Sequence, residues 1–290
     1  WTANAIDGHF DEQFDIGRYV DLEIHESEIM GFNATTASFA YYDGDRGNAR
    51  VADVLIDGGT PITTPIGSGF PPEWTEGLLV SAQYTSLGLS SDGTHYIAWY
   101  DPSAELTFSP QIQYSQYTWD PTGIVPEGWD LFTDGFTGIE LSALLPSDID
   151  FEDTLVETQT NGLRIEMTNG VDDTAEVPCV AYIDSEINAL KFGCEGVALW
   201  AGVIETLPIE GYIPSQPDFA ISAGDEYFIS FYNQTTRDLM LASKRKDSDW
   251  EIITVDSDGD VGQASSIDIG ADGSIHISYY DATNGVLRYA

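Results

Sequence analysis

Short apolar and aromatic runs recur along the chain, and each of them ends at an Asp or Asn that opens a polar turn. The clearest example lies at the end of the sequence, where His276-Ile-Ser-Tyr-Tyr-Asp281 is followed by Ala-Thr-Asn-Gly285 and then by Val286-Leu-Arg-Tyr-Ala290. β-Branched and aromatic residues favour strands, whereas Asp, Asn and Gly favour the turns between them. The pattern therefore predicts a β-hairpin over residues 276–290.

Further segments carry the same pattern, so the hairpin is a repeated unit. These segments are Ser38–Asp43, Tyr96–Asp101, Cys179–Asp184 and Phe228–Asn233. We expect the aromatic residue within each first strand to lie in the core between sheets; these residues are Tyr41, Trp99, Tyr182, Phe231 and Tyr279. We expect the residue that opens each turn to cap its own backbone; these residues are Asp43, Asp101, Asp184, Asn233 and Asp281.

Each hairpin is flanked by further strand-like segments. The upstream segments fit one common slot and are Gly17–Ile24, Gln83–Leu89, Leu163–Ile165, Gln216–Ile221 and Gln263–Ile269. Downstream, a strand that begins with tryptophan is expected at Trp74, Trp129, Trp200 and Trp250. The repeated unit is therefore predicted to have four strands.

Five four-stranded units in succession are typical of a β-propeller, in which each sheet buries both faces against its neighbours. We predict an all-β, five-bladed β-propeller that forms a single domain over residues 1–290, with repeats at about 8–80, 81–135, 136–206, 207–256 and 257–290 plus 1–7. The last repeat lacks a fourth strand, and Trp1–Ile6 resembles it. We expect this N-terminal strand to complete the last blade and close the ring. The alternative is that it pairs with a neighbouring molecule, which would build a chain of propellers.

Two segments, Val255–Gly262 and His276–Ala290, resemble the tandem repeats of secreted bacterial and archaeal β-propeller proteins, which are loosely akin to sialidase-like propellers. The resemblance implies an extracellular or cell-surface propeller, often part of a larger surface protein, and it transfers no catalytic residues. Sialidase activity itself is disfavoured. The turn at Ser90–Thr94 lacks the Ser-x-Asp-x-Gly-x-x-Trp motif, and Arg50 and Arg288 occupy one repeated strand position instead of forming part of an arginine triad.

The charge of the chain excludes several classes of partner. The chain carries 49 acidic and 10 basic residues, a formal net charge of -39, and such a surface repels nucleic-acid phosphates and anionic lipids. A content of 42 % apolar and 12 % aromatic residues nevertheless predicts a folded protein. We expect neither nucleic-acid binding nor direct membrane insertion. We interpret the acidity as a halophilic type of surface adaptation to salt or divalent cations.

Two features point to a secreted or cell-surface protein. Cys179 and Cys194 lie on the two strands of the third hairpin and face each other if the turn spans Ser185–Asn188. We predict a disulfide between them, which suits an oxidising compartment; the alternative is two buried thiols. Asn33 and Asn233 begin Asn-x-Thr triplets and are candidate glycosylation sites, with Asn233 favoured because it opens a turn.

We expect no cofactor; the alternative that the sequence offers is Ca²⁺. Asp256, Asp258 and Asp260 alternate in one loop, and carboxylate oxygens are the ligands that Ca²⁺ prefers. An Asp- and Gly-rich turn without metal explains the same residues, because such turns are common between strands.

Two groups of residues are candidates for chemistry or recognition. The upstream strands supply Asp21, Glu23, Asp218 and Asp268, which could act as the paired carboxylates of a glycosidase at the channel of a propeller. Phe70, Tyr117 and Trp119 lie in Pro- and Gly-rich insertions, at 60–73 and 116–128, where ligand-binding loops are common.

The sequence favours a non-catalytic binding, adhesion or assembly module for glycan or protein at the cell surface. The first alternative is a glycosidase-like hydrolase that uses Asp21, Glu23, Asp218 and Asp268. The second is a structural subunit of a surface layer or filament, in which the N-terminal strand is exchanged between molecules.

Overall fold

The computed structural model describes the chain over residues 16–29, 32–43, 48–57, 60–62, 83–91, 94–101, 111–118, 160–169, 176–194, 204–209, 211–245 and 248–290. Within these residues every regular element is a β-strand, which confirms the predicted all-β class. The chain divides into two compact units, Trp1–Pro146 and Ser147–Ala290.

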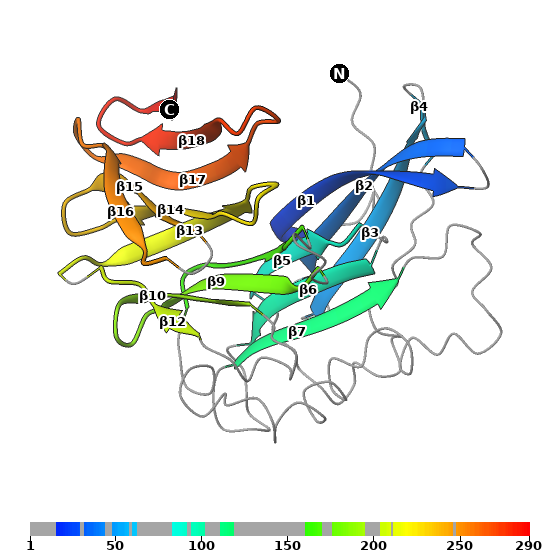
Figure 1. The fold of residues 1–290 in the computed structure, drawn as a ribbon, viewed down its shortest axis with the longest axis horizontal. Coiled ribbons are helices and arrows are strands. Elements are labelled where there is room, and N and C mark those ends of the chain that lie inside the picture. Colours follow the sequence, from blue (N-terminus) through cyan, green and yellow to red (C-terminus); the bar gives the residue numbers. More distant parts are fainter. Residues whose placement is uncertain are drawn as a thin grey trace. The chain divides into compact units, whose positions relative to one another are not determined.

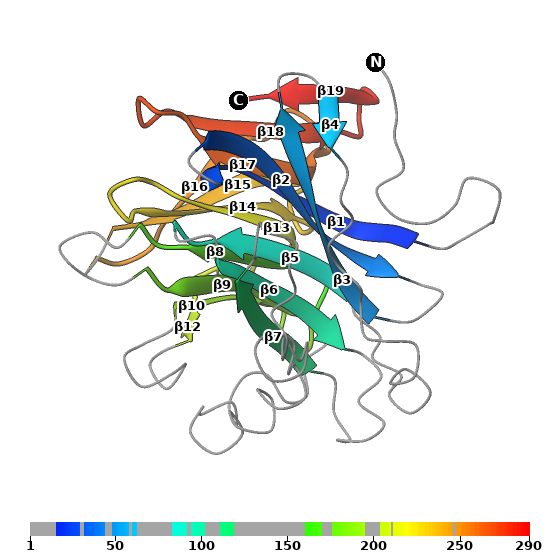
Figure 2. The ribbon, with the colours of Figure 1, turned by 90° about the vertical axis from the view of Figure 1, so that its right-hand side faces the viewer.

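The described part of the first unit contains two antiparallel sheets. Strands β1 (Ile16–Ile29), β2 (Phe32–Asp43), β3 (Asn48–Asp57) and β4 (Thr60–Ile62) follow one another in the first sheet. Strands β5 (Gln83–Leu89), β6 (Thr94–Asp101) and β7 (Gln111–Thr118) form the second sheet (Figure 2). The strand order matches the chain order, as expected for hairpin-connected repeats.

The second unit contains three antiparallel sheets (Figure 1). The first consists of β8 (Leu163–Met167), β9 (Pro178–Asp184), β10 (Ala189–Cys194) and β12 (Glu205–Thr206). The second consists of β13 (Pro214–Ile221), β14 (Tyr227–Asn233), β15 (Asp238–Lys244) and β16 (Glu251–Asp256). The third consists of β17 (Val261–Ile269), β18 (Ile275–Asp281) and β19 (Val286–Tyr289). Apolar clusters fill the space on both sides of the middle sheet.

The fourth strands agree with the sequence expectation only in part. Trp250 directly precedes β16, as predicted. In the first sheet β4, at Thr60–Ile62, pairs with β3 as the fourth strand, and Trp74 lies outside the described residues. Asp57 pairs with Thr60, and the sequence between them is Gly58-Gly59, a favoured two-residue hairpin sequence. The strands expected at Trp129, Trp200 and Trp1–Ile6 lie outside the described residues; the fourth strand of the β8–β10 sheet is β12, at Glu205–Thr206.

The predicted core aromatics are all buried. Tyr41, Trp99, Tyr182, Phe231 and Tyr279 are each at most 5 % exposed. In the second unit the first and middle sheets pack against each other through Phe192. Its ring packs edge-on against Phe219 and Trp250, with centroid distances of 5.5 Å and 5.1 Å. The recurring aromatic position therefore serves packing between sheets, as the sequence indicated.

The three described hairpin turns, all in the second unit, form as predicted, whereas the turns after Asp43 and Asp101 lie outside the described residues. The Oδ1 atom of Asp184 accepts the backbone N–H groups of Glu186 and Ile187, and Asn233 and Asp281 accept equivalent bonds in their own turns. The fifth residue of each of these turns has a left-handed backbone; these residues are Asn188 (φ 53°), Arg237 (φ 67°) and Gly285 (φ 68°).

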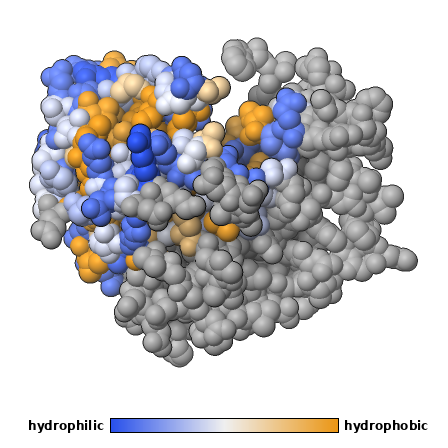
Figure 3. Space-filling model, in the orientation of Figure 1, coloured by the Kyte–Doolittle hydropathy of each residue, from blue (hydrophilic) through white to orange (hydrophobic). Residues whose placement is uncertain are grey.

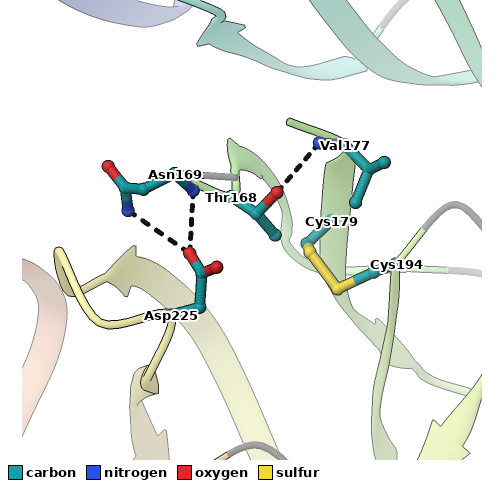
Figure 4. Close-up of a disulfide and its surroundings, with 6 residues drawn as sticks. All are labelled: Thr168, Asn169, Val177, Cys179, Cys194 and Asp225. Atoms are coloured by element: carbon teal, nitrogen blue, oxygen red, sulfur yellow. Dashed lines mark hydrogen bonds between the residues drawn. A yellow bond between two sulfur atoms is a disulfide. The ribbon is translucent and has the colours of Figure 1, made fainter. Parts of the chain in front are cut away.

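The predicted disulfide forms between facing residues. Cys179 pairs in register with Cys194, their Cα atoms are 3.9 Å apart, and their sulfurs are bonded (Figure 4). Nearby, the buried carboxylate of Asp225 accepts the backbone N–H of Asn169 at 2.7 Å. This second contact ties the end of β8 to the turn between β13 and β14.

Among the described residues, β1 and β19 each carry an apolar side chain that is exposed where the equivalent residues of other sheets are buried. In the first unit Leu22 is 45 % exposed, whereas the residues at the same repeat position, Leu87, Ile165, Phe219 and Ile267, are at most 6 % exposed. In the second unit Leu287 on β19 is 78 % exposed, whereas its equivalents Leu190 and Leu239 are fully buried. Figure 3 shows apolar residues at the surface of the described part of this unit, interspersed with polar ones.

Candidate functional site

One polar position recurs on the inner strand of every sheet, the strand with which each repeat begins. Each residue at this position pairs with the third residue of the next strand, which is the first strand of the hairpin. The residues are Asp21, Ser86, Arg164, Asp218 and Ser266. In four of these strands a register shift precedes the position, and the residue two places earlier has a left-handed backbone; these residues are Tyr19, Tyr84, Gln216 and Ala264. A β-bulge of this kind re-aims the side chains that follow it.

In the second unit, Asp218 joins three inner strands. Its Oδ1 accepts Arg164 Nε from β8 at 2.6 Å, and its Oδ2 accepts the backbone N–H of Ile267 from β17 at 2.8 Å. The side chain of Asp218 is only 13 % exposed. Gln216 makes a parallel contact, because its side-chain oxygen accepts the backbone N–H of Ala264 at 2.8 Å.

In the first unit, Asp21 plays the same part. Its Oδ2 accepts both the Ser86 hydroxyl at 2.7 Å and the backbone N–H of Leu87 at 3.0 Å. Asp21 and Asp218 therefore each bind the backbone N–H at one repeat position of the following sheet. Sequence reasoning proposed both as candidate acids but missed this shared structural contact.

The other two candidate carboxylates occupy a different repeat position. Glu23 pairs in register with Ser38, and Asp268 pairs with His276. The Oδ1 of Asp268 accepts the backbone N–H of the next residue, Ile269, at 2.7 Å. Asp21 and Asp218 therefore bind the next sheet, whereas Glu23 on β1 and Asp268 on β17 lie two residues beyond that repeat position.

The first carboxylate of the loop predicted to bind Ca²⁺ is bonded to an arginine of β19. Arg288 donates from Nη1 to Asp256 at 2.8 Å and from Nε to Asp281 at 2.7 Å, and Tyr279 donates its hydroxyl to Asp256 at 2.7 Å. Partial burial works to raise the pKa of Asp256. Bonds from the Asp258 N–H, from Tyr279 and from Arg288 outweigh it and hold that pKa below its usual range.

The remaining carboxylates of this loop diverge. The side chain of Asp258 is 91 % exposed and lies 3.8 Å from Arg288. Asp260 accepts the Tyr232 hydroxyl at 2.8 Å and the Gln263 amide at 3.0 Å. Among the described residues no group of three or more His, Cys, Asp or Glu side chains is placed to hold a metal ion. Arg288 thus pairs closely with one of the three predicted Ca²⁺ ligands, Asp256, and Ca²⁺ binding stays a prediction.

The structure argues against Asn233 as the favoured glycosylation site. Asn233 is fully buried, and its side-chain nitrogen, the atom that would carry a glycan, donates to Thr236 at 2.8 Å. Its role as a turn cap, which the sequence also predicted, takes precedence. Asn33 pairs with Glu28 near the start of β2, and its glycosylation stays a prediction.

Two of the three aromatic residues proposed as ligand contacts, Phe70 and Trp119, lie outside the described residues. Tyr117 belongs to β7, where it pairs in register with His95. The expectation that Tyr117 lies in an insertion loop is therefore wrong, because the strand continues to Thr118.

A pocket that sequence reasoning missed lies in the second unit, at the end of β14, β15 and β16. It has a volume of about 380 Å³ and is lined by Glu226, Phe228, Ser243, Lys244, Arg245, Ser248, Asp249 and Glu251. One sequence signal could have found it. Three of the ten basic residues of this acidic chain are consecutive, at Lys244-Arg245-Lys246.

No family model matches the chain, and no curated protein matches its sequence. The chain is similar in structure to a protein of unknown function from Dyadobacter fermentans (TM-score 0.58, 11 % identity), covering 95 % of this chain and 78 % of that one. It is also similar to a mutant of AofleA from Arthrobotrys oligospora, in which arginines are replaced by alanine (TM-score 0.53, 11 % identity, covering 93 % and 68 %).

A third similar structure is a GH43 β-1,3-galactosidase with galactodeoxynojirimycin (TM-score 0.52, 10 % identity), covering 94 % of this chain and 93 % of that one. At such identities the likeness concerns the fold alone. Together with the repeated sheets, it supports an all-β, propeller-like fold.

Proposed function

We propose that the protein is a non-catalytic, glycan-binding module of the cell surface, built as a closed five-bladed propeller. The similarity in fold to a GH43 β-1,3-galactosidase favours glycan over other ligands. The disulfide between Cys179 and Cys194 favours an oxidising, extracellular setting. No helix in the described part of the chain is long and apolar enough to cross a membrane.

The observation that supports a non-catalytic role is the hydrogen bonding of Asp21 and Asp218. A glycosidase needs one carboxyl group to give up a proton and another to act as nucleophile or base at a bound sugar. Asp21 instead accepts two hydrogen bonds from β5, and Asp218 accepts one from β8 and one from β17. Carboxylates held in this way stabilise the junction between sheets and are poorly suited to proton transfer with a substrate.

The closed ring is supported by two exposed apolar side chains. Among the described residues compared above, Leu22 and Leu287 are the only ones that are exposed at their repeat positions. Burying an apolar side chain of this size stabilises the fold by about 2 kcal/mol. Packing of the first sheet against the last, with Trp1–Ile6 as the missing fourth strand, would cover both. Exchange of that strand between molecules would cover them in an assembly instead.

The experiment is a glycan array probed with the full-length protein, together with an assay for newly formed reducing ends on the glycans that bind. We expect retention of defined glycans without release of reducing ends. Hydrolysis that is lost in Asp21→Asn or Asp218→Asn variants would favour the glycosidase alternative, and an array without any binding would contradict the proposal.

A further inference from the structure

The pocket at the end of β14, β15 and β16 has a floor made by one row of residues across the sheet. Phe228 pairs in register with Ser243, and Ser243 pairs with Glu251. Cross-strand partners project to the same face, so an aromatic ring, a hydroxyl and a carboxylate lie side by side. Phe228 also packs against the apolar cluster below it, which holds the floor in place.

A bonded network supports the pocket from one side. Lys244 Nζ lies 2.6 Å from both oxygens of Glu205, and the indole N–H of Trp250 donates to the same carboxylate at 2.9 Å. The Lys244 side chain is only 14 % exposed. The Lys244 ammonium group is therefore paired with Glu205. We assign to Lys244 a structural role at the end of β15, and we look for ligand contacts among the other lining residues.

The rim carries polar groups that are available to a ligand. Arg245 is 79 % exposed and pairs through Nε with Glu226 at 2.7 Å, which orients the guanidinium and leaves its terminal N–H groups toward solvent. Asp249 and Glu251 are exposed and have no hydrogen bond or ion pair from their carboxylates within the described residues. The rim therefore offers charged donors and charged acceptors close together.

We propose that this pocket binds a neutral saccharide unit, a conclusion that rests on the proposed glycan-binding function and assigns its site. The lining holds three carboxylates and two cations, so an anionic ligand would meet net repulsion. Vicinal hydroxyls can donate to Asp249 or Glu251 while accepting from Arg245. The apolar face of the sugar ring would cover Phe228. A volume of about 380 Å³ lies in the usual range for small-ligand sites.

The test is calorimetric titration of the full-length protein with methyl β-galactoside, methyl β-glucoside, methyl α-mannoside and methyl α-arabinofuranoside. Arg245→Ala and Glu251→Gln should each weaken binding of the preferred glycoside by about tenfold or more, because each removes a charged hydrogen-bond partner. The matched control is Arg237→Ala, which removes an arginine of similar exposure (67 %) from the opposite end of β15; it should bind as the wild type does. Unchanged melting temperatures for Arg245→Ala and Glu251→Gln would exclude unfolding as the cause.

Three results would overturn the assignment. Equal affinity of wild type, Arg245→Ala and Glu251→Gln would place saccharide binding elsewhere and leave the proposed function standing. Binding of putrescine in preference to every glycoside would identify a cation site. Failure of the wild type to bind any saccharide, here and on the array, would remove the proposed function together with the pocket.

Discussion

Asp218 accepts the backbone N–H of Ile267 at 2.8 Å, so a side chain of one sheet completes the hydrogen bonding of the next. Its other oxygen pairs with Arg164 at 2.6 Å. Replacing it in Asp218→Ala leaves the N–H group and the guanidinium without this partner. We expect the free energy of unfolding to fall by about 2–3 kcal/mol in urea titrations. Asp218→Asn retains an acceptor and should cost less.

The control for this prediction is Asp268→Asn. Asp268 is exposed and bonds only to its own neighbouring N–H in the described contacts, so its replacement should change stability by less than about 0.5 kcal/mol. If Asp218→Ala were as stable as the wild type, Asp218 would not hold the sheets together, and a catalytic role for its carboxylate would have to be considered again.

The hairpin turns allow a reciprocal test of backbone strain. Gly285 has φ 68°, and a Cβ at this position would have no atom within 4 Å. Gly285→Ala should therefore destabilise the protein only by the cost of holding alanine in a left-handed backbone conformation. That cost is about 1 kcal/mol. Arg237 has φ 67° at the equivalent position, and Arg237→Gly should be as stable as the wild type or more stable by up to about 1 kcal/mol. Thermal melts measure both, and a stabilising Gly285→Ala would contradict the shared turn geometry.

The closed ring predicts an unusual response at Leu287. A substitution of a surface leucine to glutamate changes stability by less than about 0.5 kcal/mol, and Leu287 is 78 % exposed. If the first sheet covers it, Leu287→Glu should instead cost 2 kcal/mol or more, roughly the loss for charging a buried apolar site. Ile187→Glu is the control, because Ile187 is 61 % exposed in a turn. Equal, small effects of the two would argue for an open face, and a protein-concentration dependence of melting would favour strand exchange.

The hydrogen bonds to Asp256 predict a specific loss of stability in acid. Because its hydrogen bonds hold the pKa of Asp256 below the unfolded value of about 3.9, the stabilisation is fully present above about pH 5 and is lost as the pH falls through the folded-state pKa. Stability measured by urea unfolding should therefore fall less steeply below pH 4 in Asp256→Asn than in the wild type. Asp258→Asn alters a side chain that is 91 % exposed and should follow the wild-type curve. Parallel curves for all three proteins would refute this assignment.

The net charge of -39 predicts that salt stabilises the fold. Repulsion between exposed acids is reduced as the screening length falls from about 10 Å at 0.1 M to about 3 Å at 1 M ionic strength. The melting temperature should rise with NaCl over this range, and it should also rise with CaCl₂. Indifference to both salts would leave the acidity without a role in stability.

The sequence was sufficient to predict those features that depend on local, repeated patterns. The hairpins, the buried aromatics such as Phe231 and the facing pair Cys179 and Cys194 all follow from alternation and turn residues, and the structure confirms them. The contact from Asp218 to Ile267 could not be predicted, because it depends on a bulge that re-aims the side chain toward another sheet. The same holds for the pocket, since the row of Phe228, Ser243 and Glu251 arises from strand register.

The most direct test of the account is native mass spectrometry of the full-length protein after incubation with a neutral oligosaccharide selected on the glycan array. A non-catalytic glycan-binding module should carry the oligosaccharide at its intact mass, with the free sugar unchanged in length. Shortened sugars in solution, or the absence of any sugar-bound species, would contradict it.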